Sequence, residues 1–316
     1  MGLILEEPGE HGAIAAVLAE GRRAAAAART QFAIATVDRY LTVFEAFLDA
    51  GWAPLKLFTI ALENQSDGNL CAIRHAEALN VEVQLSRIRE RDLSDLRERG
   101  CDVMIVAGYK WRIGDWRPYL KHAINFHPSP LPEGRGPYPL VRALLEDRRS
   151  WAVTCHKINQ HFDAGDILAQ EEFPVGADDC HESLTLKIQM AAKRLAARVA
   201  ENFADLWDTA SPQGEGSYWK PWTADEQTMD FTRPVESVMR HARAFGLIES
   251  IARLKGMVLY VRRVVGWTEA HHYPPGTHVH TAGHTLVIAV RDGYVGLVEW
   301  SLIPQDAVAH LGRSRW

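Results

Sequence analysis

The fold is decided by the stretch Ala123-Ile124-Asn125-Phe126-His127-Pro128-Ser129-Pro130-Leu131-Pro132. Its first four residues predict a short buried strand. The prolines that follow can neither continue a sheet nor start a regular helix, so we expect the chain to turn at His127. Asn125 and His127 are two residues apart and therefore project from the same face of that strand. An amide and an imidazole thus lie at a strand end, where ligands bind in open α/β sheets.

A second stretch, Phe162-Asp163-Ala164-Gly165-Asp166-Ile167, adds a carboxylate to this pair. Residues 151–158 are rich in β-branched and aromatic residues and predict a strand that runs into the loop bearing Asp163, so we expect this carboxylate also to lie beyond a strand end. Amide, imidazole and carboxylate together suit acyl transfer to an amine, because attack on a carbonyl needs a donor for the oxyanion and a base for the nitrogen proton. Each residue alone would indicate only an ordinary turn or a structural histidine.

Strands and helices alternate through the first half of the chain. Hydrophobic patterning predicts strands at 32–37, 55–60, 81–84 and 102–107, and helices at 40–50, 70–79 and 92–99. This alternation predicts an α/β fold with a Rossmann-like parallel sheet covered by helices. No Gly-x-Gly-x-x-Gly motif follows the first strand, so a dinucleotide is not implied.

The second half of the chain changes character after a long helix. Apolar residues recur at helical spacing over 184–203, and a segment rich in turn-forming residues follows at 210–217. A helix at 234–245 then precedes short strands at 257–264, 278–281, 285–290 and 294–300. We therefore divide the chain into an Ala-rich N-terminal extension (1–30), an α/β catalytic domain (31–209), a linker (210–232) and a smaller, mostly β, barrel-like C-terminal domain (233–316).

Composition fits a globular enzyme. The 316 residues are 47% hydrophobic, enough for one large and one smaller core, and the net charge of -5 gives no general attraction to nucleic acid or to an anionic membrane. No apolar stretch reaches the roughly 18 residues of a membrane helix. The four cysteines form no Cys-x-x-Cys pair, and no secretory leader is recognisable, which predicts a reduced, cytoplasmic setting.

The two stretches together resemble the formyltransferases that use 10-formyltetrahydrofolate, a group that includes the glycinamide ribonucleotide, methionyl-tRNA and sugar N-formyltransferases. The shared pattern is Asn-x-His-Pro-Ser-x-Leu-Pro, then a glycine, a Val-Thr strand and Asp-x-Gly-Asp-Ile-Leu. The resemblance implies catalytic roles for Asn125, His127 and Asp163, with 10-formyltetrahydrofolate as co-substrate and no metal. Pro130 replaces a usual apolar residue and Phe162 a usual leucine.

The resemblance also implies a folate site. Residues 106–113 are similar to the stretch in which the family's backbone groups hold the pterin ring. The implied cofactor contacts are Ala107, Gly108, Tyr109, Lys110, Trp111, Ile113, Phe162 and Gly165. Arg135 and Tyr138, just after the proline loop, are candidate acceptor contacts. Arg135 would either steer an anionic acceptor or anchor the loop.

The acceptor is left open by the sequence. Our preferred hypothesis is a small-molecule amine such as a nucleotide-linked amino sugar, because the charge is acidic overall and residues 66–69 carry no Lys/Arg-dense insertion. Methionyl-tRNA is the alternative, because charge can be local and the order of domains resembles that of the tRNA enzyme. The same three groups could instead activate water, giving a 10-formyltetrahydrofolate hydrolase. A catalytically silent folate-binding module ranks last because all three groups are present.

Three other features have simpler interpretations. The histidines at 271, 272, 278, 280 and 284 lack a cysteine or clustered carboxylate that would complete a metal site, so we expect an exposed hairpin. Residues 218–222 (Tyr-Trp-Lys-Pro-Trp) favour an aromatic clasp for the linker over a stacking platform. Cys155 and His156 face opposite sides of their strand and cannot act as a nucleophile–base pair.

Overall fold

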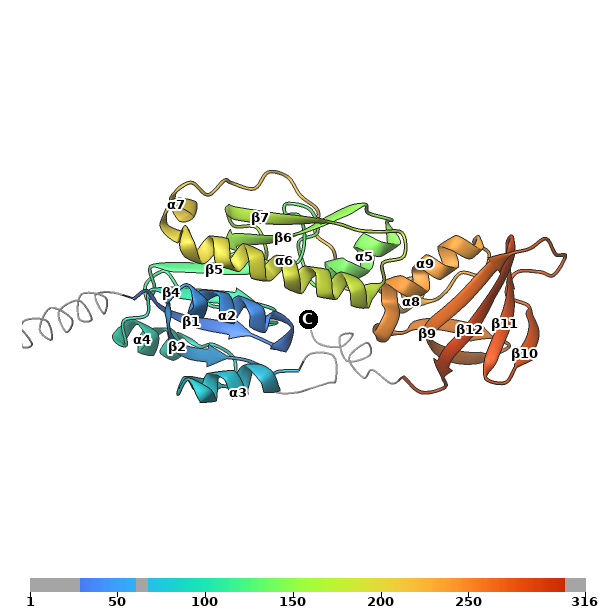
Figure 1. The fold of residues 1–316 in the computed structure, drawn as a ribbon, viewed down its shortest axis with the longest axis horizontal. Helices are drawn as coiled ribbons and strands as arrows, with labels where there is room; N and C mark the ends of the chain where they lie inside the picture. The colour runs from blue at the N-terminus through green and yellow to red at the C-terminus, as the bar shows by residue number, and fades with distance from the viewer. Residues whose placement is uncertain (1–28, 61–67, 305–316) are drawn as a thin grey trace, which may run out of the picture.

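A seven-stranded sheet forms the larger part of the computed structural model, which describes residues 29–60 and 68–304 (Figure 1). The strand order is β3-β2-β1-β4-β5-β6-β7. The strands are β1 (Gln31–Thr36), β2 (Ala53–Phe58), β3 (Glu82–Gln84), β4 (Val103–Ala107), β5 (His122–His127), β6 (Ser150–Lys157) and β7 (Ile167–Pro174). The first five pair in parallel, whereas β6 and β7 pair antiparallel. The predicted α/β fold is confirmed, and β7 is a strand that the sequence patterns did not reveal.

Both faces of this sheet are buried, which explains the continuous apolar runs in its strands. Along β1, Phe32 and Ile34 join one core cluster while Ala33 and Ala35 join the other. Helices α2, α3, α5 and α6 cover the first face, and α4 covers the second. The helices and 3₁₀ turn of this part are η1 (Asp38–Tyr40), α2 (Leu41–Asp49), α3 (Leu70–Ala78), α4 (Glu90–Glu98), α5 (Pro139–Leu145), α6 (His181–Glu201) and α7 (Phe203–Asp208).

The direction of β6 corrects one expectation. Asn125 is paired with His156 and His127 with Thr154, so β6 runs back along β5 and ends beside Ile124. Its carboxyl end therefore lies at the opposite edge from that of β5, so the expected placement of the Asp163 loop beyond the same edge of a parallel sheet is wrong for β6. Asp163, on the connection between β6 and β7, still has its Oδ1 atom 3.4 Å from His127 Nδ1.

A second, antiparallel sheet follows the long helix α6. Its strand order is β10-β11-β12-β9-β8, and the two edge strands, β10 and β8, do not pair with each other in the described part of the chain. Met229 and Phe231, which we placed in the linker, pack into the core of this sheet. The elements are α8 (Ala224–Gln227), α9 (Val235–Phe245), η2 (Gly246–Ile248), β8 (Ser250–Leu254), β9 (Met257–Thr268), β10 (His278–Ala282), β11 (Thr285–Val290) and β12 (Gly293–Ser301).

The two parts meet where α5 approaches α9 (Figure 1), and aromatic side chains pack between them. Trp222 lies between Tyr138 and Phe245, with ring centroids 5.0 and 5.6 Å away. Trp219 stacks on the buried Trp151 at 5.7 Å. These contacts support the aromatic clasp over the stacking platform for residues 218–222.

The remaining expectations concern histidines, membrane helices and the N-terminus. His271 Nε2 contacts the carbonyls of Val290 and Gly293, and His284 stacks on Trp300.

Within 29–60 and 68–304, no three His, Cys, Asp or Glu side chains are arranged to hold a metal, and no helix is long and apolar enough to cross a membrane. The Ala-rich extension expected at 1–30 lies outside the described residues, except for residues 29 and 30.

Candidate active site

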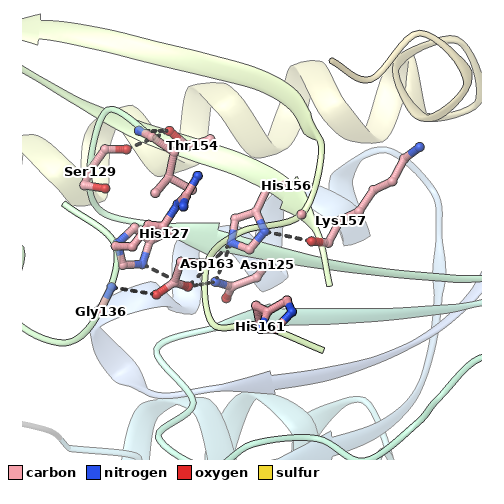
Figure 2. Close-up of polar contacts among 12 residues, drawn as sticks. Asn125, His127, Ser129, Gly136, Thr154, His156, Lys157, His161 and Asp163 are labelled. Carbon is pink, nitrogen blue, oxygen red and sulfur yellow. Dashed lines mark hydrogen bonds and ion pairs between the residues drawn. The ribbon is translucent and has the colours of Figure 1, made fainter. Parts of the chain in front are cut away.

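The carboxylate of Asp163 is the centre of a polar cluster at the end of β5 (Figure 2). Its Oδ1 atom accepts a hydrogen bond from Asn125 Nδ2 at 3.2 Å and lies 3.4 Å from His127 Nδ1. Its Oδ2 atom accepts the backbone N–H of Gly136 at 2.9 Å. The structure therefore brings together the three residues that the motifs single out, two from β5 and one from the loop at 158–166.

His127 is a buried imidazole with acceptors at both ring nitrogens. Nε2 lies 2.8 Å from the carbonyl oxygen of Gly134, which can only accept, while Nδ1 faces Asp163. Burial lowers the pKa of His127, and the Asp163 charge and the Gly134 carbonyl oppose that shift. A proton added to this ring would satisfy both acceptors at once. The ring is therefore placed to exchange a proton without leaving a donor unpaired.

The Asp163 carboxylate stays ionised in this environment. Burial by itself would raise its pKa, but the charges of His127 and His156 and the N–H of Gly136 outweigh burial and hold the pKa of Asp163 well below its usual range. A carboxylate of this kind orients a neighbouring imidazole and balances its charge. It is a weak proton acceptor near neutral pH.

A second histidine, His156, belongs to the cluster and was not found from the sequence. Its Nδ1 atom lies 2.8 Å from the carbonyl of Lys157 and therefore carries the proton in the neutral ring. Nε2 lies 3.1 Å from Asn125 Nδ2 and 3.6 Å from Asp163 Oδ1. Alternation along the strand correctly separates His156 from Cys155, which lies in the apolar core. Only the pairing of β6 with β5 reveals which site His156 faces.

The amide of Asn125 has both of its N–H groups engaged. One donates to Asp163 Oδ1 and the other to His156 Nε2, as the dashed lines in Figure 2 show. The expected donation from Asn125 or His127 to a substrate oxygen therefore requires that the substrate replace one of these internal acceptors. The site is a closed network before substrate arrives.

The turn that carries Asp163 is tightly packed. Asp163 has a φ of 51°, in the left-handed region that non-glycine residues rarely adopt. A Cβ atom at Gly165 would lie 1.8 Å from the carbonyl oxygen of Lys157, so the glycine is required for the turn to rest on β6. Phe162, on the same turn, has 55% of its surface exposed. Packing therefore explains the glycine without any ligand.

Replacing Gly165 with alanine is expected to destabilise the protein by about 1–3 kcal/mol, because the new methyl group overlaps backbone that cannot move freely. The same overlap should displace Asp163 and lower activity. Urea unfolding measures the first effect. Gly214→Ala is the matched control, because a Cβ there meets nothing within 4 Å. Equal stability of the two variants would contradict the packing explanation.

The expected folate stretch follows β4, whose last residue pairs with Phe126 of β5. Gly108 has a φ of 76°, and a Cβ there would lie 2.7 Å from the Tyr40 ring. In the described part of the chain, the backbone groups of Gly108, Trp111 and Ile113 make no hydrogen bonds to other backbone groups. Arg112 donates to the carbonyl of Gln160 at 2.6 Å, tying this stretch to the Asp163 loop. The stretch therefore lies beside the loop that carries Asp163.

The two candidate acceptor contacts have structural partners. Arg135 donates to Gln213 Oε1 at 3.0 and 2.8 Å and to the carbonyl of Gly214 at 3.0 Å, which supports anchoring of the loop over steering of an anion. Tyr138 has a φ of 59° and packs its ring against Trp222. These partners, Gln213, Gly214 and Trp222, are not members of the Asp163 cluster.

Comparison with known proteins gives one consistent family. Residues 63–200 match the family model described as "Formyl transferase". The methionyl-tRNA formyltransferase of Coprothermobacter proteolyticus is 30% identical over 65% of this chain and 68% of its own length. That of Halorhodospira halophila is 30% identical over 72% of this chain and 76% of its own length. Other such relatives are matched over less, for example 54% of the Sulfurimonas denitrificans protein.

Solved structures show the same fold. HypX from Aquifex aeolicus in complex with tetrahydrofolic acid superposes with a TM-score of 0.61 at 19% identity, covering 86% of this chain and 44% of HypX. The N-formyltransferase of Helicobacter canadensis superposes with a TM-score of 0.61 at 14% identity, covering 87% of this chain and 100% of that protein.

The comparisons assign a mixed α/β sheet with a buried Asn–His–Asp cluster at a strand end to the group-transfer enzymes. The family match and the relatives at 30% identity establish that this chain belongs to the formyl transferase family, whose members transfer one-carbon formyl groups.

Proposed function

We propose that the protein transfers the formyl group of 10-formyltetrahydrofolate to an amine, with Asn125, His127 and Asp163 acting on the reacting carbonyl. The observation that carries the proposal is the position of Asp163, within 3.4 Å of both His127 Nδ1 and Asn125 Nδ2. The HypX structure with tetrahydrofolic acid supports a folate as the donor.

The residues beside the cluster fit a folate. The edge of a pterin ring carries hydrogen-bond donors and acceptors that backbone groups can match, and those of Gly108, Trp111 and Ile113 have no backbone partners in the described ranges. Tyr109 and Trp111 stand edge to face with centroids 5.3 Å apart, and the exposed ring of Phe162 offers a further apolar surface. We assign residues 107–113 to the pterin and the Phe162 turn to the formyl-bearing side.

In the proposed reaction, a neutral amine attacks the formyl carbon and a new N–C bond forms. The bond between that carbon and N10 of the folate then breaks, and tetrahydrofolate leaves with the proton that the amine has lost. Negative charge develops on the formyl oxygen, and Asn125 and His127 stabilise it once the substrate replaces one of their internal acceptors. Asp163 balances the charge of the imidazole. Because the pKa of Asp163 is low, this carboxylate is a poor base near neutral pH, and we assign the amine proton to the neutral imidazole of His127, whose pKa is lowered by burial.

For the acceptor we favour the amine of a small molecule, such as a nucleotide-linked amino sugar. The net charge of -5 offers no general attraction to a polyanion. A sugar N-formyltransferase, WlaRD, superposes with a TM-score of 0.63 over 86% of this chain. Methionyl-tRNA is the second candidate, favoured by the relatives of that name at 30% identity.

Acceptor assays separate these candidates. The purified protein is mixed with 10-formyltetrahydrofolate and either charged initiator tRNA or a panel of nucleotide-linked amino sugars, and labelled formyl transfer is measured. We expect transfer to an amino sugar, and weak filter binding of tRNA that changes little between two salt concentrations. Efficient formylation of the tRNA would move the assignment to the second candidate. Formate release without any amine would replace transfer by hydrolysis.

A further inference from the structure

One side chain of the segment between the two sheets reaches into the active site. Gln213 donates through Nε2 to the carbonyl of Asp163 at 3.0 Å and to that of Gly165 at 2.6 Å. Through Oε1 it accepts two hydrogen bonds from the guanidinium of Arg135. A single amide thus joins the turn of Asp163 to the loop that follows the proline stretch.

The turn of Asp163 depends on such support. Its backbone lies in the left-handed region, a conformation that persists only when surrounding contacts determine it. The Gln213 amide holds two carbonyls of this turn, on either side of Ala164, and so limits how the turn can rotate. The direction in which the Asp163 carboxylate points follows from that orientation.

The loop around Arg135 also contacts the catalytic residues. Its neighbours Gly134 and Gly136 supply the carbonyl that contacts His127 Nε2 and the N–H that binds Asp163 Oδ2. The backbone of Arg135 is paired with Ser217 and Trp219 of the same interdomain segment. Gln213 therefore links the turn that carries Asp163 to the loop of Arg135, whose neighbours contact His127 and Asp163.

We propose that Gln213 is a positioning residue for formyl transfer, setting the Asp163 carboxylate against His127 and Asn125, so that the interdomain segment completes the active site. This inference rests on the proposed function for its kinetic readout. It assigns Gln213 no contact with substrate and no role in proton transfer.

The decisive variant is Gln213→Glu. A glutamate keeps oxygens for Arg135 but has no N–H for the carbonyls of Asp163 and Gly165. We expect kcat to fall by about 10- to 100-fold, because small displacements of a catalytic group cost rates of this order. The KM values for donor and acceptor should change less, since Gln213 does not contact them. Glu215→Gln, an exposed neighbour in the same segment, is the control and should keep wild-type kinetics.

A second measurement separates a positioning role of Gln213 from an effect on folding, and it does not depend on which reaction the protein catalyses. The imidazole of His127 is titrated by NMR in the wild type and in Gln213→Met, which removes the same N–H donors as Gln213→Glu without adding a negative charge near His127, with its signals assigned from their loss in His127→Asn. Loosening the Asp163 contact removes an interaction that raises the pKa of His127, so we expect the titration to move to lower pH in the variant. This readout needs no turnover.

Each outcome decides the inference. A lower kcat and a shifted His127 titration, in variants whose thermal unfolding midpoints match that of Glu215→Gln, support it. Unchanged kcat and an unchanged titration overturn it. Loss of activity with an unchanged His127 titration also overturns it, because the cluster would then be intact. If the wild type transfers formyl to no acceptor, the proposed function fails, while the titration still tests the position of Asp163.

Discussion

Asp163→Asn is expected to lower the rate of formyl transfer by about 10²- to 10⁴-fold, the range typical of a lost general acid–base partner. The asparagine keeps the size of the side chain but removes the charge that balances the His127 imidazole. In the wild type, Asn125, His127 and Gly136 contact a carboxylate that has two acceptor oxygens. The asparagine of the variant offers these groups only one acceptor oxygen, together with an NH₂ group that donates. The rate is measured as tetrahydrofolate release and labelled product under saturating donor and acceptor.

The matched control for this prediction is Asp166→Asn on the same turn. The Asp166 side chain is partly exposed and forms an ion pair with Lys157, with Nζ and Oδ2 3.5 Å apart. We expect near-normal turnover in this variant, because exposed ion pairs of this length contribute little. If Asp163→Asn also retained near-normal turnover with the true acceptor, the roles assigned to Asp163 and His127 would be wrong.

Trp151→Ala is expected to produce the largest loss of stability, about 3–5 kcal/mol, the range for truncating a large buried aromatic residue. Trp151 is 1% exposed and packs in the main core beneath the proline loop. Its indole N–H donates to the carbonyl of Pro128 at 2.8 Å, and its ring stacks on Trp219. Truncation therefore leaves a cavity, an unpaired carbonyl and an interdomain segment without its stacking partner. Urea unfolding gives the change in the free energy of unfolding.

Two further variants show which contact is responsible. Trp151→Phe keeps a ring but removes the indole donor, so it should cost less than the alanine. Trp219→Ala removes only the stacking partner, and its effect should not add to that of Trp151→Ala, because contacting residues share one interaction. If Trp151→Ala lowered the free energy of unfolding by less than about 1 kcal/mol, the prediction would be wrong. The core would then have collapsed to fill the space of the missing ring, which a closely packed interior is not expected to do.

Parts of the fold were predictable because their signals are local. The alternating strands and helices from β1 to β4 and the buried stripe of α6 follow from side-chain periodicity within each segment. Short elements such as α5 and β8 escaped prediction, since Pro139–Leu145 and Ser250–Leu254 are too brief for a period to show. The left-handed Asp163 turn has no reliable local signal, because its conformation is determined by neighbours distant in sequence.

The sequence by itself determined the α/β class, the strand end at His127 and the three chemical groups of Asn125, His127 and Asp163, because these depend on residue identity and short-range periodicity. Only the tertiary structure decided that β6 runs antiparallel to β5, that His156 thereby faces Asn125, and that Gln213 holds the Asp163 turn. The physical reason is the range of the interactions: strand direction, cross-strand register and hydrogen bonds between distant segments are set by packing of the whole chain and leave no pattern in neighbouring residues.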